Sequence, residues 1–196
     1  MDYYQIAALL AFLFPLAYSP GPGNMFFAAS GARFGLRATL RATTGYHVAT
    51  FGVTLPIGLG FSSALVAAPQ AFAVVKIAGS LYVLWLAWKL GTAGRPGQQE
   101  AKPATFRDGA VLLLLNPKAY VIIALMFSQF LTVTSSTVQV TVISAVFTLN
   151  NLVAFTLWTT IGDRLGRTFR SEDRAPYLNA TFGGILAVVG VWMLVS

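Results

Sequence analysis

The sequence predicts an all-α integral membrane protein with six transmembrane helices. Hydrophobic residues make up 56% of the 196 positions, charged residues only 10%, and the mean hydropathy is +0.70. Soluble domains carry roughly 25% charged residues. The apolar residues also fall into stretches of about 20, the length that crosses a bilayer as a helix. Basic residues gather in every second connection between these stretches, as expected when those connections lie on the cytoplasmic side of a membrane.

The expected spans, in chain order, are residues 4–32, 43–67, 70–90, 109–133, 138–162 and 177–195. The first is not a cleavable signal peptide, because the chain starts MDYY, with an acid where a basic region would stand. A hydrophilic linker, 92–108, separates a first three-helix repeat, 1–91, from a second, 109–196. Since three crossings reverse the direction of the chain, the second repeat is expected to be inverted relative to the first, as in many secondary transporters.

The basic residues predict the orientation of these spans. Eleven of the 13 lie in three connections: Arg33, Arg37 and Arg41; Lys89, Arg95, Lys102 and Arg107; and Arg164, Arg167, Arg170 and Arg174. The two termini and the two remaining connections carry none, so the positive-inside rule places both termini in the periplasm and the basic loops in the cytoplasm. Topology accounts for these charges, so the rival interpretation, a nucleic-acid or anionic-lipid site, is not favoured and no nucleic-acid partner is expected.

The first span is interrupted at SPGPGN, where Pro20, Gly21, Pro22, Gly23 and Asn24 follow Ser19. Proline removes a backbone donor, and glycine permits backbone angles closed to other residues, so the helix is expected to unwind here. Freed backbone groups are costly in lipid unless they face protein or a wet cavity. A half-helix starting near Asn24 and Met25 would offer donors to a carboxylate. These five residues are therefore predicted to bind substrate.

The fourth span carries a second break, at Asn116, Pro117 and Lys118. Pro22 precedes Arg33 by 11 residues and Pro117 follows Arg107 by 10, so both breaks lie on the order of 15 Å from the cytoplasmic boundary, near the middle of a core about 30 Å thick. One break would equally fit a structural kink, but two at matched depth favour a transport site. Lys118 is expected to act in that site, although its long stem could instead reach the interface.

Other polar residues fall inside the spans. Asn150 and Asn151, midway along the fifth, either bond to a neighbouring helix or line the cavity. A lone histidine such as His47 is more often a packing residue than a proton carrier. All six acids lie at ends or in loops, and Asp108 and Asp163 are nearest to the membrane. The candidates for proton coupling are therefore Asp163, Asp108 and His47, with Lys118 as an alternative.

No catalytic constellation is expected, because the chain has one histidine, no cysteine and no acid pair at mid-depth. The sequence predicts no enzyme activity, no metal site and no cofactor. Two other functions remain open: a passive channel for a small ion or polar solute, and a scaffold whose breaks only bend helices. Gly183, Ala187 and Gly190 are spaced for close helix contact, either within the chain or between the protomers of a homodimer.

Three segments carry a family resemblance: SPGPGNMFFAASGARFGLRA, KIAGSLYVLWLAWKL and LLNPKAY. In this order, over almost the whole chain, they resemble the lysine exporter and threonine/homoserine efflux family, the LysE/RhtB-type translocators. The family signatures match Pro20, Gly21, Pro22 and Asn24, with Gly23 as an extra residue, and Asn116 to Lys118. The resemblance implies export of an amino acid or derivative across the bacterial inner membrane, driven by the proton motive force. The middle segment looks most like the cysteine/O-acetylserine branch.

Overall fold

The computed structural model describes residues 1–61, 69–92, 102–131, 135–169 and 175–195. The elements in chain order are α1 (Tyr3–Tyr18), α2 (Pro22–Phe34), α3 (Leu36–Pro56), the π-helical turn η1 (Ile57–Phe61), α5 (Pro69–Gly91), α6 (Phe106–Leu114), α7 (Pro117–Phe130), α8 (Thr137–Phe169) and α9 (Ala175–Val195). The described residues contain helices and no strand, so the all-α prediction is confirmed. Parts of the expected spans 43–67 and 109–133 lie outside the described residues.

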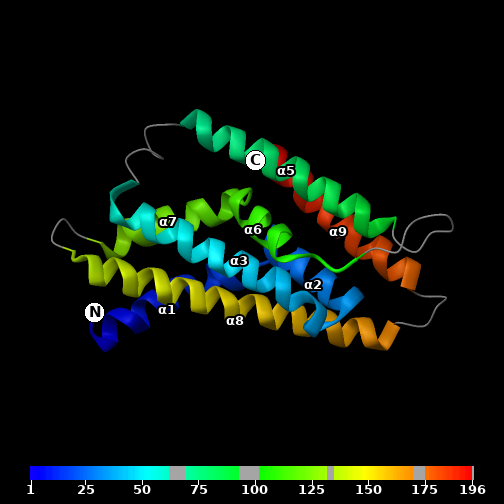
Figure 1. Cartoon of the computed structure of the whole chain (residues 1–196), viewed down its shortest axis with the longest axis horizontal. Coiled ribbons are helices and arrows are strands. Elements are labelled where there is room, and N and C mark those ends of the chain that lie inside the picture. The colour runs from blue at the N-terminus through cyan, green and yellow to red at the C-terminus, as the bar shows by residue number, and fades with distance from the viewer. Residues whose placement is uncertain (62–68, 93–101, 132–134, 170–174, 196) are drawn as a thin grey trace.

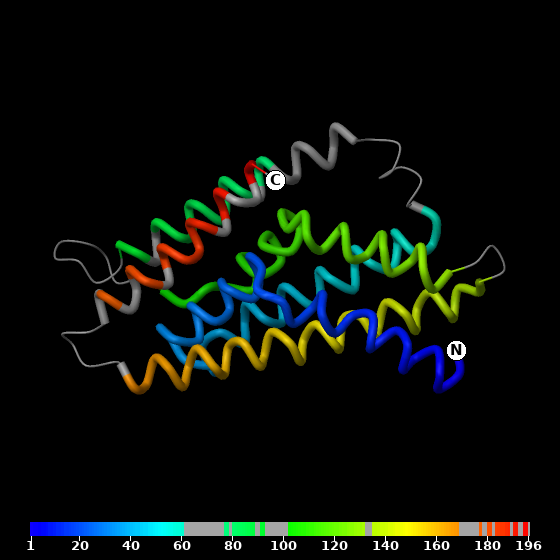
Figure 2. The backbone as a smooth tube through the Cα atoms, turned by 180° about the vertical axis from the view of Figure 1, so that it is seen from behind, coloured from blue at the N-terminus to red at the C-terminus, as the bar shows by residue number. Residues whose placement is uncertain are grey.

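The helices lie side by side along the long axis of the molecule (Figures 1 and 2). The pair α5 and α9 forms one layer, and α1, α2, α3, α6, α7 and α8 form the body beneath it. Within the body, α2 packs mainly on α8, and α3 packs on α6 and α8. The trace runs through α1 and α2 toward one end of the molecule and returns through α6 and α7 in the opposite direction.

Both expected breaks are present as sharp bends between consecutive helices. The axes of α1 and α2 differ by 64°, and those of α6 and α7 by 62°. In each case proline occupies the first turn of the second helix, where its missing N–H costs no intrahelical bond: Pro22 in α2 and Pro117 in α7. The half-helix of the first break thus begins at Pro22, two residues before the predicted start.

The glycines of the first break do not use the backbone angles that the sequence suggested. Among the described residues, positive φ angles occur only at Gly35 and Gly60, and Gly21 is extended. The expectation of special angles at Gly21 and Gly23 is therefore wrong. Space explains them instead, because a Cβ at Gly23 would lie 2.7 Å from the ring of Phe155. Gly35, with φ of 82°, makes the turn from α2 to α3.

Capping residues fix where the helices begin. Asp2 and Gln5 form a capping box at α1, and Thr105 and Asp108 form one at α6. The second box starts α6 at Phe106, inside the linker that the sequence predicted to run to residue 108. The helices α3 and α8 also extend past the expected spans into the arginine-bearing connections. A run of apolar residues predicts only the part of a helix that crosses the membrane, and the helix itself can continue into water.

Small residues allow the closest helix contacts. A Cβ at Gly162 or Gly166 of α8 would collide with the carbonyl of Ala28 or Ala32 in α2. Similar contacts join α3 to α6, where Gly45 faces the Phe106 carbonyl and Gly109 faces the Ala42 carbonyl. In α9, Gly183 lies against Gly91 and Ala87 of α5, and Gly190 lies against Leu84. Two of the α9 residues picked out by their spacing therefore serve contacts within the chain.

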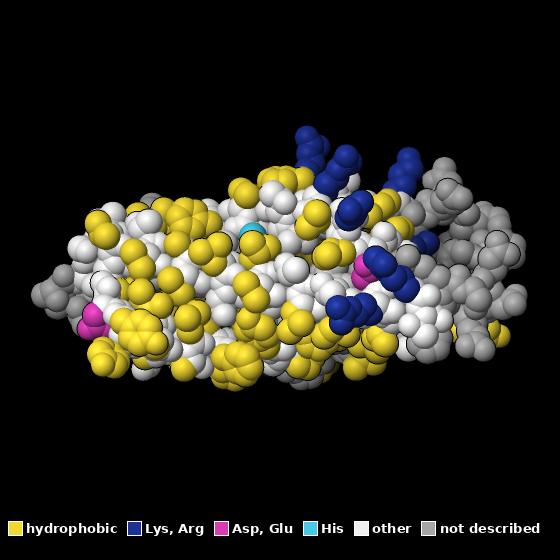
Figure 3. Space-filling view, turned by 90° about the horizontal axis from the view of Figure 1, so that it is seen from below, with side chains coloured by type: hydrophobic (Ala, Val, Ile, Leu, Met, Phe, Trp, Pro, Cys, Tyr) yellow, Lys and Arg dark blue, Asp and Glu magenta, His cyan; other side chains and the backbone are white. Residues whose placement is uncertain are grey.

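The surface is that of a membrane protein. Large hydrophobic side chains are exposed along several helices, among them Phe14 of α1, Leu125 of α7 and Leu149 of α8. Over the described ranges, one helix (Thr137–Thr168) is long and apolar enough to cross a membrane alone, and α1 with α2 and α6 with α7 qualify when each bent pair is counted as one span. Lys and Arg side chains gather toward one end of the face shown in Figure 3, the end where α2 and α8 finish.

Candidate substrate site between the two broken helices

The two breaks meet at one small cavity in the interior of the molecule, the central cavity. Its walls come from α1, the break before α2, α2, α3, the start of α7, and α8. The lining residues are Leu16, Ala17, Gly21, Gly23, Asn24, Tyr46, Asn116, Lys118, Ala119, Ile122, Phe147, Asn151 and Phe155. The cavity holds about 20 Å³, room for about one water molecule. An amino acid therefore fits only after the walls move apart.

Asn24 joins the two halves of the first broken helix. Its side-chain amide donates to the carbonyl of Ala17 at 2.8 Å and to that of Ser19 at 3.2 Å. These carbonyls belong to the C-terminal end of α1, which has no following turn to bond them. The Asn24 amide nitrogen thus bonds carbonyls at the end of α1, and Asn24 also lines the central cavity.

Two helix N-termini face the central cavity, those of α2 and α7. Neither has a side-chain cap: the N-cap of α2 is Gly21, which has no side chain, and the Asn116 side chain does not bond back to the first turn of α7. The first-turn N–H groups carry the positive ends of the helix dipoles. Together they form a region of the cavity that favours an anion such as a carboxylate.

Lys118 brings a full positive charge to the same place. Its Nζ donates to the Oγ of Ser19 at 2.9 Å and to the Ser19 carbonyl at 3.2 Å, and so bridges the start of α7 to the end of α1. A Cβ at Gly21 would lie 3.0 Å from this Nζ. The lysine therefore points into the first break rather than toward an interface. Its ammonium rests on a carbonyl at the negative end of the α1 dipole.

A polar pair closes the wall on the α3 side. The side-chain amide of Asn116 donates to the Tyr46 hydroxyl at 2.9 Å, and both side chains are buried. The Asn116 Oδ1 is also buried and accepts no hydrogen bond from the part of the chain that the structure describes. Leaving such an acceptor unpaired costs about 1–3 kcal/mol. Asn116 can therefore gain a bond when a donor, such as an ammonium group, enters the cavity.

His47 lies directly behind this wall. Its ring packs against Tyr46 and edge-on to Phe155, each with centroids 5.3 Å apart. The Nδ1 lies 2.7 Å from the Thr43 carbonyl, and because a carbonyl only accepts, Nδ1 carries the proton. The Nε2 is buried and has no hydrogen-bond partner among the described residues.

The two acids nearest to the membrane lie away from the central cavity. Asp163, buried on α8, forms a bidentate pair with Arg167 at 2.9 and 3.1 Å. Asp108 accepts from the backbone N–H and the hydroxyl of Thr105 at 2.7 and 2.8 Å in the capping box of α6. Each acid thus has a structural partner on its own helix or at its own helix end.

The structure brings six of the residues predicted from the sequence to the cavity wall: Gly21, Gly23, Asn24, Asn116, Lys118 and Asn151. Pro20, Pro22 and Pro117 stand beside them in the two breaks and shape the backbone. Asn150 does not line the cavity, because neighbouring residues in a helix point about 100° apart and Asn151 is the one that faces the cavity.

Sequence reasoning missed Ser19, Tyr46 and Phe155. Ser19 and Tyr46 had a signal, since each stands next to a residue that was singled out, while nothing in the sequence marks Phe155 among 15 phenylalanines. The described residues hold no group of three His, Cys, Asp or Glu side chains that could bind a metal ion.

Two broken helices, with polar groups at the breaks and an apolar exterior, are features of membrane transporters. Comparison with known proteins agrees with this class. Residues 14–196 match the family model described as "LysE type translocator", and the chain belongs to this family. The resemblance noted from the sequence is therefore confirmed. No solved structure matches the chain.

Three relatives align with most of the chain. A protein of Salmonella typhimurium named "Homoserine/homoserine lactone efflux protein" is 28% identical over 188 residues, 89% of this chain and 88% of its own. An Escherichia coli K12 protein named "Cysteine/O-acetylserine efflux protein" is 27% identical over 172 residues, 86% and 88% of the two chains. A Vibrio cholerae "Uncharacterized membrane protein" is 26% identical over 199 residues, 97% of each. The family consists of transporters rather than enzymes, which confirms the prediction that the chain is not an enzyme.

Proposed function

We propose that this protein exports a small amino acid or amino-acid derivative from the cytoplasm across the bacterial inner membrane, in exchange for protons. The family and the names of the relatives support amino-acid export. The substrate class that we infer is a short, polar amino acid such as homoserine, cysteine or O-acetylserine. The central cavity is the proposed substrate site.

One observation carries this proposal: the central cavity is lined both by groups that favour an anion and by groups that accept hydrogen bonds from a cation. The uncapped N-termini of α2 and α7 favour the substrate carboxylate. The carbonyls at the end of α1 and the unpaired Oδ1 of Asn116 favour its ammonium group. In the structure, the Lys118 ammonium holds the carbonyl and hydroxyl of Ser19. The substrate ammonium would take this place, and Lys118 would turn to the carboxylate.

The proposed transport cycle uses two inverted repeats, residues 1–91 and 109–196, that move relative to each other. The opposite directions of the two broken pairs support this arrangement. With the basic end in the cytoplasm, both termini lie in the periplasm. The cavity is too small for an amino acid as it stands, so binding and release need the repeats to open it, first to one side and then to the other.

His47 is the group that we propose for proton coupling. Its Nε2 is buried and unpaired among the described residues, and its ring touches two residues of the cavity wall, Tyr46 and Phe155. A proton added at Nε2 would place a charge behind this wall and alter its contacts. Asp163 and Asp108 remain alternatives, but their partners Arg167 and Thr105 already account for their positions.

Counterflow in reconstituted vesicles tests the site. Replacing Lys118 by Met should reduce exchange of radiolabelled homoserine at least tenfold, because a buried carboxylate loses its charged partner. The loss should be smaller for homoserine amide, which has no carboxylate. Lys118→Arg should restore part of the exchange, and Lys76→Met, in another expected span, is the control. Normal exchange by Lys118→Met would place the site elsewhere.

The same vesicles separate an exporter from the passive channel that the sequence left open. An exporter saturates with substrate, shows competition between homoserine, cysteine and O-acetylserine, and responds to a pH gradient. A channel does none of these. The association of two copies into a homodimer stays a prediction, and light scattering of the purified protein tests it.

A further inference from the structure

A second and larger cavity lies between the two layers of the molecule, at the basic end. It holds about 160 Å³, and we name it the vestibule. Its walls come from α2, α5, α9, the segment 102–105 and the start of α6. The residues that matter here are Phe26, Ser30, Arg33, Trp85, Thr105 and Asp108, all of which line it.

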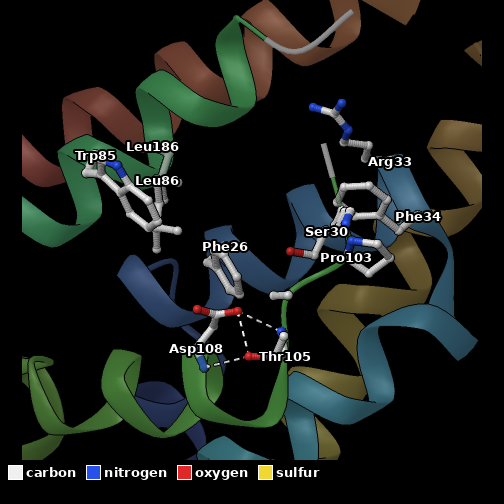
Figure 4. Close-up of a pocket in the computed structure, with 12 residues that line it drawn as sticks. Phe26, Ser30, Arg33, Phe34, Trp85, Leu86, Pro103, Thr105, Asp108 and Leu186 are labelled. Carbon is white, nitrogen blue, oxygen red and sulfur yellow. Dashed lines mark hydrogen bonds between the residues drawn. The ribbon is translucent and has the colours of Figure 1, made fainter. Parts of the chain in front are cut away.

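The vestibule presents charges of opposite sign on separate walls. Figure 4 shows Asp108 in the lower part of the view, with one carboxylate oxygen directed at Thr105 and Phe26 just above it, and Arg33 at the upper right, beyond Ser30 and Phe34. Both hydrogen bonds that Asp108 accepts from Thr105 use this one oxygen, Oδ2. Arg33 is half-buried, and its guanidinium stacks 5.0 Å from the ring of Phe34. A second cation, Lys102, and the hydroxyl-bearing Ser30 also line the vestibule, and most of the remaining lining is aromatic or aliphatic.

We propose that the vestibule is a second binding site for the exported amino acid, occupied on the cytoplasmic side before the central cavity. Asp108 takes the ammonium group and Arg33 takes the carboxylate. This proposal rests on the proposed function for its substrate class. It assigns the two residues to substrate capture rather than to topology or helix capping alone.

The position of the vestibule fits this sequence of events. Phe26 lines the vestibule, and its ring touches Phe27 with centroids 5.3 Å apart. Phe27 in turn packs on Tyr46 and Phe155, which line the central cavity. A chain of aromatic contacts therefore runs from the lining of the vestibule to the lining of the central cavity.

Trp85 gives a direct readout, because its side chain lines the vestibule. The test uses the full chain with Trp88, Trp158 and Trp192 changed to Phe, so that Trp85 is the sole tryptophan. Homoserine, cysteine and O-acetylserine are titrated separately while tryptophan fluorescence is recorded. At least one should give a saturable change. A matched protein that keeps only Trp88, which is exposed on the same helix and does not line the vestibule, should give none.

Variants of the Trp85 protein then show whether its fluorescence reports binding in the vestibule or in the central cavity. Asp108→Asn keeps an oxygen for the Thr105 bonds and removes the charge. It should therefore raise the amino-acid concentration that gives half of the Trp85 fluorescence change at least tenfold. Arg33→Gln should have the same effect. The signal should survive Lys118→Met, which disables the central cavity. A Trp85 signal that is absent, insensitive to Asp108→Asn and Arg33→Gln, or lost in Lys118→Met overturns the vestibule site. Counterflow by the unmodified protein reports on the proposed function independently.

Discussion

At the scale of single residues, the site depends on how much space a side chain leaves as well as on its polar groups. Gly23 permits Phe155 and Tyr46 to approach the first break. Gly21 leaves room for the end of the Lys118 side chain. Gly23 faces a rigid aromatic ring, whereas Gly21 faces the flexible end of a lysine side chain. Their substitutions should therefore differ in effect.

Gly23→Ala should reduce homoserine counterflow about tenfold or more, because the new methyl group would lie 2.7 Å from the Phe155 ring and overpack the cavity wall. Gly21→Ala should cost less, since its neighbour is the movable end of Lys118. Gly52→Ala is the control, with no atom within 4 Å of its Cβ. Equal activity of the Gly23 and Gly52 variants would remove the first break from the site.

His47→Gln should make homoserine export independent of the pH gradient while substrate exchange continues. Glutamine retains hydrogen-bonding groups but does not titrate. The measurement is export at fixed substrate with and without an imposed gradient. Asp163→Asn and Asp108→Asn should keep the response to the gradient. If instead one of these two loses it and His47→Gln does not, the coupling residue is an acid at the cytoplasmic mouth.

At the scale of the helices, the broken pairs are held by glycine contacts that lie outside the site. The short helix α2 has its first turn at the central cavity and its last turns against α8, where Gly162 and Gly166 meet the carbonyls of Ala28 and Ala32. This close contact fixes α2 against the long helix. It thereby sets the position of the N-terminus that faces the cavity.

Gly162→Ala should destabilise the protein by about 1–3 kcal/mol, because its Cβ has no space beside the Ala28 carbonyl. The expected result is a lower midpoint of thermal unfolding in detergent. Gly184→Ala in α9 should leave the midpoint unchanged, since no atom lies within 4 Å of that Cβ. Equal midpoints for the two variants would mean that the contact between α2 and α8 accommodates the added methyl group without loss of stability.

At the scale of the whole molecule, two chain segments of opposite direction carry the two breaks to one place. The pair α1 and α2 and the pair α6 and α7 run in opposite directions along the long axis (Figure 1). If the membrane lies across this axis, the two pairs cross it in opposite senses. Single cysteines at the starts of α1 and α6 can be followed directly, because the chain has no cysteine of its own.

Cysteines placed at Asp2 and at Arg107 should react with an impermeant thiol reagent from opposite sides of the cell membrane, Asp2 from the periplasm and Arg107 from the cytoplasm. A cysteine at Ser136, before α8, should react from the periplasm. The positive-inside rule predicts these sides. Labelling of the Asp2 and Arg107 positions from the same side would contradict the inverted repeats.

The helical class, the family and the places where two helices break could all be predicted from the amino-acid sequence. These properties are local: apolar length, proline, and charge between spans act through neighbouring residues in the chain. The six lining residues that were predicted all lie in or beside such local signals, apart from Asn151. The two acids and His47 were also visible as candidates, because ionisable groups near a membrane are few.

How these residues are used depends on the packing of the helices and could not be predicted. The folded chain turns Asn151 rather than Asn150 to the cavity, directs the Asn24 amide to the end of α1, and brings Tyr46 and Phe155 to the break. Each outcome depends on the rotation of one helix against another. That rotation follows from the packing of many side chains and glycine contacts distant in sequence, so no local pattern in the chain specifies it.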